Sequence, residues 1–273
     1  MNVRRHPFSA AVALAVILFL WAPLMIVALN SVNRDVLLAS WKGATTAWYH
    51  QAFANPDVRS GLRQTLTVAA STTALSLVLA VTAALWWRRA SARMRRLFDG
   101  LTYLRIMLPE VVFAVALFLL FSRLKFPLGT TAIVIGHTVW NSAYATLIVQ
   151  ARVSTLDPAL EDAAADLGAN PWRTFRRVTV PGLLPGIVAA GLLAFTFSFD
   201  DVVTSYFLTG AGTSTLPVVL LSMIRFRITP EINAIGMMVM LFTITMFAIG
   251  FVAITNLGRG ARRRLALPEA PRG

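Results

Sequence analysis

Three carboxylates stand out because they lie inside long apolar stretches of the sequence, where charged side chains are costly. Glu110 follows a proline, and Asp200 is followed at once by Asp201. Acidic residues inside membrane spans generally face a water-filled path or a partner charge. The three acids therefore predict a site that binds cations. Two alternatives stay open: the aspartates could form a solvated helix end, and Glu110 could pair with Arg105.

The two adjacent aspartates cannot both face the same path if they lie on one helix. Neighbouring residues of an α-helix point about 100° apart. Asp201 shares a helical stripe with Ser198 and Ser205, and this polar stripe favours Asp201 as the residue that faces the path. Asp200 is then expected to contact a neighbouring protein element.

A stripe of polar and aromatic residues lies in another apolar stretch. His137, Asn141 and Tyr144 recur at helical spacing, with Trp140 beside them. Aromatic faces attract organic cations, so Trp140 and Tyr144 are further candidates for a cation path. Hydrogen bonding between membrane helices is the alternative function of His137 and Asn141.

The sequence contains no recognisable catalytic or metal-binding pattern. Its three histidines lie in different segments, and it has no cysteine. No stretch matches the glycine-rich loop with which many proteins bind ATP phosphates. We therefore expect no catalytic residue, no metal site and no cofactor in this chain, so that energy for any work has to come from a partner.

The composition is that of a membrane protein. Hydrophobic residues make up 57% of the chain and charged residues 14%, whereas soluble domains are about a quarter charged. The formal net charge of +13 could indicate nucleic-acid binding. However, the arginines gather at the ends of apolar stretches, so we expect contact with membrane lipid and no nucleic-acid partner.

Six apolar stretches are long enough to cross a bilayer. Lipid offers no hydrogen-bond partners, so the backbone N–H and C=O groups of each span have to pair with one another, as they do in a helix. The sequence thus predicts an all-α membrane protein with six transmembrane helices in a single domain, residues 1–273. The expected spans are about 8–29, 65–87, 104–121, 131–151, 183–203 and 232–255.

A polar loop, residues 155–181, joins the fourth and fifth spans. Asp157 can cap a short helix, and Gly168 is a natural helix stop. A second short helix then begins near Asn170 and is expected to end at Pro181.

The first short helix of this loop carries a small apolar stripe. Leu160, Ala163, Ala164 and Leu167 follow helical spacing, and the stripe is too small to build a core. Its size suits insertion into the groove of another protein. An ordinary connector between two spans is the alternative.

The same loop resembles the EAA loop of ABC-importer permeases. Asp162-Ala163-Ala164, Gly168 and the hydrophobic ending at Pro181 fall at the family spacing, with Asp162 in place of the usual glutamate and Glu161 one position earlier. The resemblance implies a type I ABC importer permease fold, in which this loop docks on the ATP-binding subunit. The coupling residues that it implies are Glu161, Asp162, Ala163, Ala164, Gly168 and Pro181.

Other segments resemble the spermidine/putrescine branch of these permeases. They are Pro109 to Leu117, Leu193 to Gly210, Thr215 to Ile224 and Thr229 to Ala234. This similarity implies a transport subunit that is not itself an enzyme and that carries a small cationic solute, a polyamine. The acids and rings singled out above suit such a solute, so the expected pathway residues are Glu110, Trp140, Tyr144, Asp200 and Asp201.

The resemblance also implies a set of partners. They are a second permease subunit, two ATP-binding subunits that hold the ATP, and an extracytoplasmic solute-binding protein. Related branches import opines, thiamine or ferric iron, so these solutes remain alternatives. An ion-coupled secondary carrier and a structural membrane protein are alternatives of other classes, although neither explains the polar loop.

The distribution of positive charge predicts the orientation in the cytoplasmic membrane. Of the 25 lysines and arginines, 17 lie at the two termini, between the second and third spans including Arg105 at the start of the third, and in loop 155–181 including Arg152 just before it. Positive residues favour the cytoplasmic side, so both termini and this loop are expected to be cytoplasmic.

Cysteine labelling tests this orientation, and the chain has no native cysteine to interfere. A Trp172→Cys variant should react with a membrane-impermeant thiol reagent only after the membrane is opened. Labelling from outside in intact cells would show that the orientation is wrong.

Overall fold

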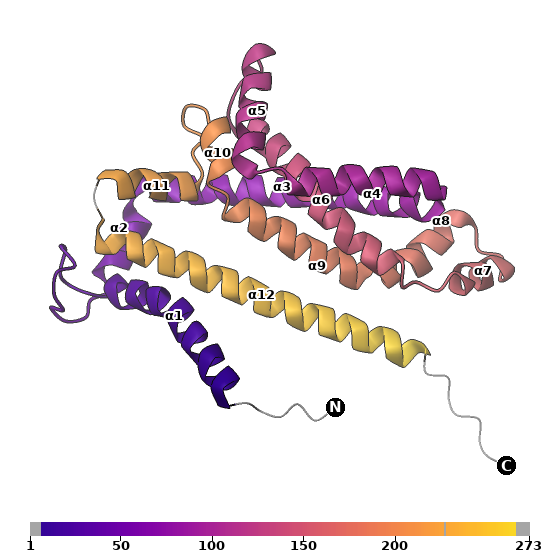
Figure 1. Ribbon diagram of the computed structural model, residues 1–273, viewed down its shortest axis with the longest axis horizontal. Coiled ribbons are helices and arrows are strands. Elements are labelled where there is room, and N and C mark those ends of the chain that lie inside the picture. The colour runs from indigo at the N-terminus through magenta and orange to yellow at the C-terminus, as the bar shows by residue number, and fades with distance from the viewer. Residues whose placement is uncertain (1–6, 227, 266–273) are drawn as a thin grey trace. The chain divides into compact units, whose positions relative to one another are not determined.

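The computed structural model describes residues 7–226 and 228–265, and every regular element in these ranges is a helix (Figure 1). The N-terminal and C-terminal residues for which a cytoplasmic location is expected, 1–6 and 266–273, lie outside the described residues. The helices are α1 (Pro7–Ser31), α2 (Ala47–Ala54), α3 (Pro56–Arg89), α4 (Ala92–Met107), α5 (Glu110–Arg123), α6 (Thr130–Val153), α7 (Ala159–Asp166), α8 (Pro171–Thr174), the π-helix η1 (Phe175–Thr179), α9 (Val180–Phe199), α10 (Val203–Leu208), α11 (Leu216–Phe226) and α12 (Pro230–Leu265).

Five described helices are long and apolar enough to cross a membrane, and a sixth span is a bent pair. The pair consists of α4 and α5, whose axes differ by 97° (Figure 1). The expected single helix over 104–121 is therefore wrong. Pro109 explains the break, because it has no backbone N–H and disfavours the helical conformation of Leu108, which is extended.

The helical segment that includes the fifth expected span begins earlier and ends earlier than the sequence predicted. Pro181 does not end a short helix, because α8, η1 and α9 form one continuous helix from Pro171 to Phe199. A proline is tolerated near the first turn of α9, where its missing N–H is not needed. The fifth span, expected to extend to residue 203, ends at Phe199.

The structure divides into two compact units. The first contains the chain up to Ser60 together with Val219–Thr243, and the second contains Gly61–Val218 with the chain from Ile244 onward. The single domain expected over residues 1–273 stays a prediction. All the expected pathway and coupling residues belong to the second unit.

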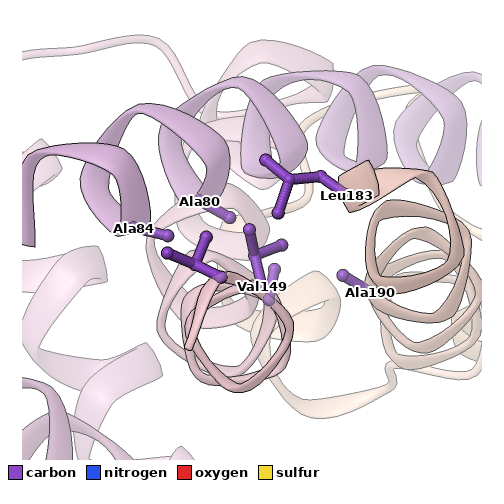
Figure 2. Packing of buried hydrophobic residues seen from close by; sticks show 7 residues of the cluster. Ala80, Ala84, Val149, Leu183 and Ala190 are labelled. Atoms are coloured by element: carbon purple, nitrogen blue, oxygen red, sulfur yellow. The ribbon is translucent and has the colours of Figure 1, made fainter. Parts of the chain in front are cut away.

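The core of the second unit lies where α3, α6 and α9 pack together. Ala80 and Ala84 from α3, Val149 from α6, and Leu183 and Ala190 from α9 form one buried cluster (Figure 2). Small residues at such contacts let membrane helices approach closely and gain dispersion energy. This packing holds α6 and α9, which carry most of the candidate pathway residues, in fixed register.

In the first unit, a polar loop between α1 and α2 is ordered by Asp35. Its buried carboxylate accepts a hydrogen bond from the Lys42 ammonium at 3.0 Å and others from the backbone N–H groups of Leu37, Ala39 and Ser40. The bond from Lys42, with those from the backbone, lowers the pKa of Asp35 to about 2. The carboxylate therefore stays ionised at all physiological pH values.

A close contact between α6 and α9 in the second unit predicts an effect on stability. A Cβ added at Gly186 of α9 would lie 2.6 Å from the Cβ of Arg152 in α6, so the two helices would have to move apart. We expect Gly186→Ala to destabilise the protein by about 1–3 kcal/mol, as overpacking does. The measurement is the temperature at which the purified protein loses its monodisperse elution peak.

Gly100→Ala is the matched control, because nothing lies within 4 Å of a Cβ at that helical position. Alanine forms helices better than glycine by about 1 kcal/mol, so this variant should be neutral or slightly stabilised. Equal midpoints for the two variants would contradict the close packing of α6 against α9.

Candidate functional site

One cavity of about 570 Å³ brings together the five pathway residues that were expected from the sequence. Its walls come from the start of α5, the middle of α6, the end of α9 and the segment that follows α9. The lining residues are Glu110, Trp140, Tyr144, Thr196, Phe197, Asp200, Asp201, Val202 and Val203.

Glu110 is the first residue of α5, directly after the break at Pro109. The N-terminal end of a helix carries partial positive charge, which stabilises a carboxylate there. Thr204 of α10 donates a long hydrogen bond of 3.5 Å to Glu110 Oε1. The bend between α4 and α5 thus places an acid in the cavity wall that a straight span would not place there.

Asp200 lies at the C-terminal end of a helix, whereas Glu110 lies at an N-terminal end. It is the C-terminal capping residue of α9, and it is exposed. The C-terminal end of a helix carries partial negative charge, so α9 does not stabilise this carboxylate. A cation beside Asp200 would be attracted by both the carboxylate and the helix end.

Asp201 is held by a buried hydrogen-bond network. Its Oδ1 lies 3.0 Å from His137 Nε2 and accepts the backbone N–H of Ser205 at 2.7 Å. The other imidazole nitrogen, Nδ1, lies 2.7 Å from Ser198 Oγ. Because a carboxylate only accepts, Nε2 carries the proton toward Asp201, and in the neutral imidazole Nδ1 accepts from Ser198.

This network changes the comparison of the two aspartates. The sequence-based choice of Asp201 assumed one continuous helix, and that premise is wrong because residues 200–202 lie between α9 and α10. The Asp201 side chain is 8% exposed, whereas Asp200 is exposed at the cavity. Both line the cavity, so which of them meets a cation stays a prediction.

Aromatic rings form a second part of the wall. The ring centroids of Trp140 and Tyr144 lie 6.2 Å apart, and those of Tyr144 and Phe197 lie 5.3 Å apart with an edge-to-face arrangement. Such rings offer faces to a cation and apolar surface to methylene groups. The cavity therefore combines carboxylates with aromatic surface.

Arg105 does not form the ion pair with Glu110 that was left open as an alternative. Its guanidinium instead lies against Phe113 and Trp140, with Cζ 4.0 Å from each ring centroid. Sequence reasoning missed Phe113 as a neighbour of the site. The available signal was its spacing from Glu110, because residues three apart share one face of a helix.

Thr196, Val202 and Val203 were also missed. Their place in the cavity depends on the end of α9 at Phe199, directly before the two aspartates for which a solvated helix end had been left open as an alternative. His137 and Asn141 match the alternative that was weighed for them, hydrogen bonding between helices. Asn141 donates to the carbonyl of Ala194 in α9 at 3.2 Å.

The polar loop 155–181 is tied to α3 by Glu161. The Glu161 carboxylate forms a 2.9 Å ion pair with Arg88 and accepts a 2.8 Å hydrogen bond from Thr179 of η1. Gly168 ends the first short helix with φ of +80°, the left-handed conformation that favours glycine. Asp157 accepts the backbone N–H of Ala159 and so caps the start of α7, as expected.

The apolar stripe of α7 faces solvent. Leu160 is 41% exposed and Leu167 is 90% exposed, and Trp172 of α8 is 68% exposed. Asp162 and Ala163 are exposed as well, whereas Ala164 is partly covered. Exposed apolar side chains beside a charged rim are typical of a surface that binds another protein.

Comparison with known proteins places this arrangement in a family. A family model described as "Binding-protein-dependent transport system inner membrane component" matches residues 62–263. The chain is 31% identical to the putrescine transport system permease protein PotI of Escherichia coli (strain K12), over 100% of this chain and 99% of that protein. It is 29% identical to the spermidine/putrescine transport system permease protein PotC of Haemophilus influenzae (strain ATCC 51907 / DSM 11121 / KW20 / Rd), over 85% of this chain and 90% of the relative.

Solved structures show the same fold at low sequence identity. A bacterial ABC transporter involved in the import of the acidic polysaccharide alginate has a TM-score of 0.72 at 16% identity, covering 89% of this chain and 94% of that chain. The MetNI methionine ABC transporter in an inward-facing conformation has a TM-score of 0.61 at 14% identity, covering 72% and 94%.

The network around Asp201 predicts that the two adjacent aspartates differ in their contribution to stability. Asp201→Ala removes the acceptor for the N–H groups of His137 and Ser205, and buried donors without a partner cost about 1–3 kcal/mol. Asp200→Ala, at an exposed position, should leave the thermal midpoint of the purified protein nearly unchanged. Equal midpoints for the two variants would show that the network does not hold the segment after α9.

Proposed function

This chain belongs to the family of binding-protein-dependent transport system inner membrane components, the membrane subunits of ABC importers, and we propose that its solute is a polyamine. The observation that carries the proposal is the cavity that collects Glu110, Asp200 and Asp201 beside Trp140 and Tyr144. The names of the relatives PotI and PotC support the same solute class.

The chemistry of the cavity suits a polyamine. Such a solute carries several ammonium groups separated by methylenes, so it needs carboxylates at intervals and apolar or aromatic surface between them. We assign Glu110 and Asp200 to the ammonium groups, because both line the cavity and Asp200 is exposed. Asp201 then adds negative charge while its bonds to His137 and Ser205 hold the segment in place.

Energy for transport comes from partner subunits in this proposal. The chain supplies the membrane path, binds no ATP and catalyses no covalent step. Two ATP-binding subunits engage the exposed surface of α7 and α8, and their closure moves loop 155–181. The residues assigned to coupling are Glu161, Asp162, Ala163, Ala164, Gly168 and Pro181.

A second permease subunit and an extracytoplasmic binding protein complete the proposed importer. The family description names a binding-protein-dependent system. One solved relative is the alginate transporter in complex with a pentasaccharide-bound periplasmic protein. The orientation with both termini and loop 155–181 in the cytoplasm is part of the proposal, supported by the distribution of arginines.

An opine, thiamine or ferric iron is the alternative solute within the same importer class. A cavity with carboxylates and aromatic rings favours an organic polycation over an anion, since the acids would repel negative charge. An ion-coupled secondary carrier is disfavoured by family membership and by the exposed surface of α7.

The test is uptake of labelled putrescine and spermidine by the complex assembled with its own partner subunits in vesicles. Glu110→Gln and Asp200→Asn should each reduce uptake about tenfold or more, because a partly desolvated charge pair is worth over about 1.4 kcal/mol. Asp57→Asn is the control, since Asp57 is exposed and does not line the cavity.

Uptake of either polyamine that depends on ATP and on the binding protein is the supporting result. Wild-type activity in both cavity variants would show that these carboxylates do not meet the solute. Absence of polyamine uptake by the wild-type complex, together with uptake of thiamine or ferric iron, would overturn the assignment of the solute.

A further inference from the structure

The guanidinium of Arg105 lies in an open slot against two aromatic rings, those of Phe113 and Trp140, which contact each other with their centroids 5.5 Å apart at a tilt of 45°. Its Cζ is 4.0 Å from each ring centroid. All three of its nitrogens are buried, and none has a hydrogen-bond partner within the residues that the structure describes. An arginine usually pairs with carboxylates or carbonyl oxygens, and a buried charge without such partners is costly. The two aromatic faces are therefore the closest groups that stabilise this charge, and Tyr144 and Glu110 attract it from farther away.

The slot lies between residues that line two different cavities. Trp140 lines the carboxylate cavity of about 570 Å³ described above. Arg105 lines a second cavity of about 700 Å³, formed by α3, α4 and α6. The α3 residues of this second cavity, Leu79 to Trp86, directly precede Arg88, which pairs with Glu161 of the polar loop. The contact between Arg105 and Trp140 therefore joins the walls of the two cavities.

We propose that the slot formed by Phe113 and Trp140 is a second ammonium-binding site of the pathway, and that Arg105 fills it until a substrate cation displaces it. This inference rests on the proposed transport of a polyamine and adds a site to it. An organic ammonium and a guanidinium are bound by the same attraction to an aromatic face, so they compete for one place.

The position of the slot suits a substrate with two charges. Glu110 and Phe113 are three residues apart in α5, so their Cβ atoms are neighbours at about 5–6 Å. The carbon chain of a short diamine can bridge that separation. One ammonium group can stay at the Glu110 carboxylate while the second enters the slot.

Arg105 thereby selects for charge number. A monoamine has to leave the carboxylates before it can displace the guanidinium, whereas a diamine keeps one charge paired during the exchange. The positive charge of Arg105 also repels single cations from the place where the walls of the two cavities join. The slot therefore favours solutes that carry at least two ammonium groups.

The experiment measures equilibrium binding of labelled putrescine, and of n-butylammonium as a single-charge probe. It uses the assembled permease and ATPase complex in lipid nanodiscs, without the binding protein. The variants are Arg105→Gln, Arg105→Lys, Trp140→Leu and the double variant Arg105→Gln/Trp140→Leu. They form a cycle that separates competition for the slot from general charge repulsion.

Competition predicts that Arg105→Gln binds both probes about tenfold more tightly than wild type, with the larger gain for n-butylammonium. Arg105→Lys, which keeps a cation beside the rings, should restore binding near that of wild type. The gain from Arg105→Gln should disappear when Trp140 is leucine. An equal gain in the Trp140→Leu background would mean simple repulsion, and unchanged or weaker binding in Arg105→Gln would overturn the slot.

If a variant at Arg105 fails to assemble, the side chain is instead changed by chemical modification after the complex has assembled. Arg105→Cys is made in the cysteine-free chain and, after assembly, modified with either an aminoethyl or a methyl thiosulfonate reagent. The aminoethyl group restores a cation and should weaken probe binding relative to the methyl group, and equal binding would overturn the proposal. If the wild-type complex takes up no polyamine, the proposed function is refuted but the slot is not. Binding of n-butylammonium to the same variants still decides whether the slot binds an ammonium group.

Discussion

The site depends on two interruptions of helical structure, one before α5 and one after α9. A helix that breaks inside a membrane leaves backbone N–H and C=O groups without partners, and such breaks are tolerated only in protein or beside a water-filled cavity. Here the break at Leu108–Pro109 places Glu110 at a helix start, and the break after Phe199 places Asp200 at a helix end. Because α5 packs against α10, both breaks border one cavity. The carboxylates therefore face space that can hold water or a cation, rather than lipid.

Hydrogen bonds from one side chain of α6 hold together the two sides of the second break. His137 of α6 reaches Ser198 before the break, Asp201 within it and Ser205 after it. A single imidazole thus links side chains on both sides of the break, while Asp201 accepts the backbone N–H of Ser205. The network fixes the position of Asp200 beside the cavity without using its carboxylate. The polar stripe of α6 therefore serves two functions: His137 holds the backbone, and Trp140 and Tyr144 form the cavity wall.

Sequence reasoning could identify the helices and the acids because both depend on local composition. Apolar length predicts a span, and an acid within a span is unusual enough to indicate a site. Pro109 was a local signal for a break that the expected single span over 104–121 did not take into account. Even so, a proline could not give the 97° bend, because the direction of α5 depends on its packing against α10. The end of α9 at Phe199 had one local signal, the two aspartates directly after it, and the alternative of a solvated helix end rested on them. The apolar residues on either side, Phe-Ser-Phe and Val-Val, suit a continued helix, so the sequence could not choose between the two. The stacking of Arg105 on two rings needed the positions of three helices and was beyond any pattern in one.

The path from the polar loop to the cavity follows one helix. The continuous segment Pro171–Phe199 has 29 residues, which corresponds to roughly 40 Å at about 1.5 Å per residue, and it ends at Asp200. Its interruption is the π-helical stretch Phe175–Thr179, next to the hydrogen bond between Thr179 and Glu161. Such stretches are weaker than α-helix and occur often at functional positions. A displacement of α7 therefore acts first on this weaker stretch. From there α9, whose packing against α6 through Ala190 and Val149 resists bending, leads to the residues that line the cavity.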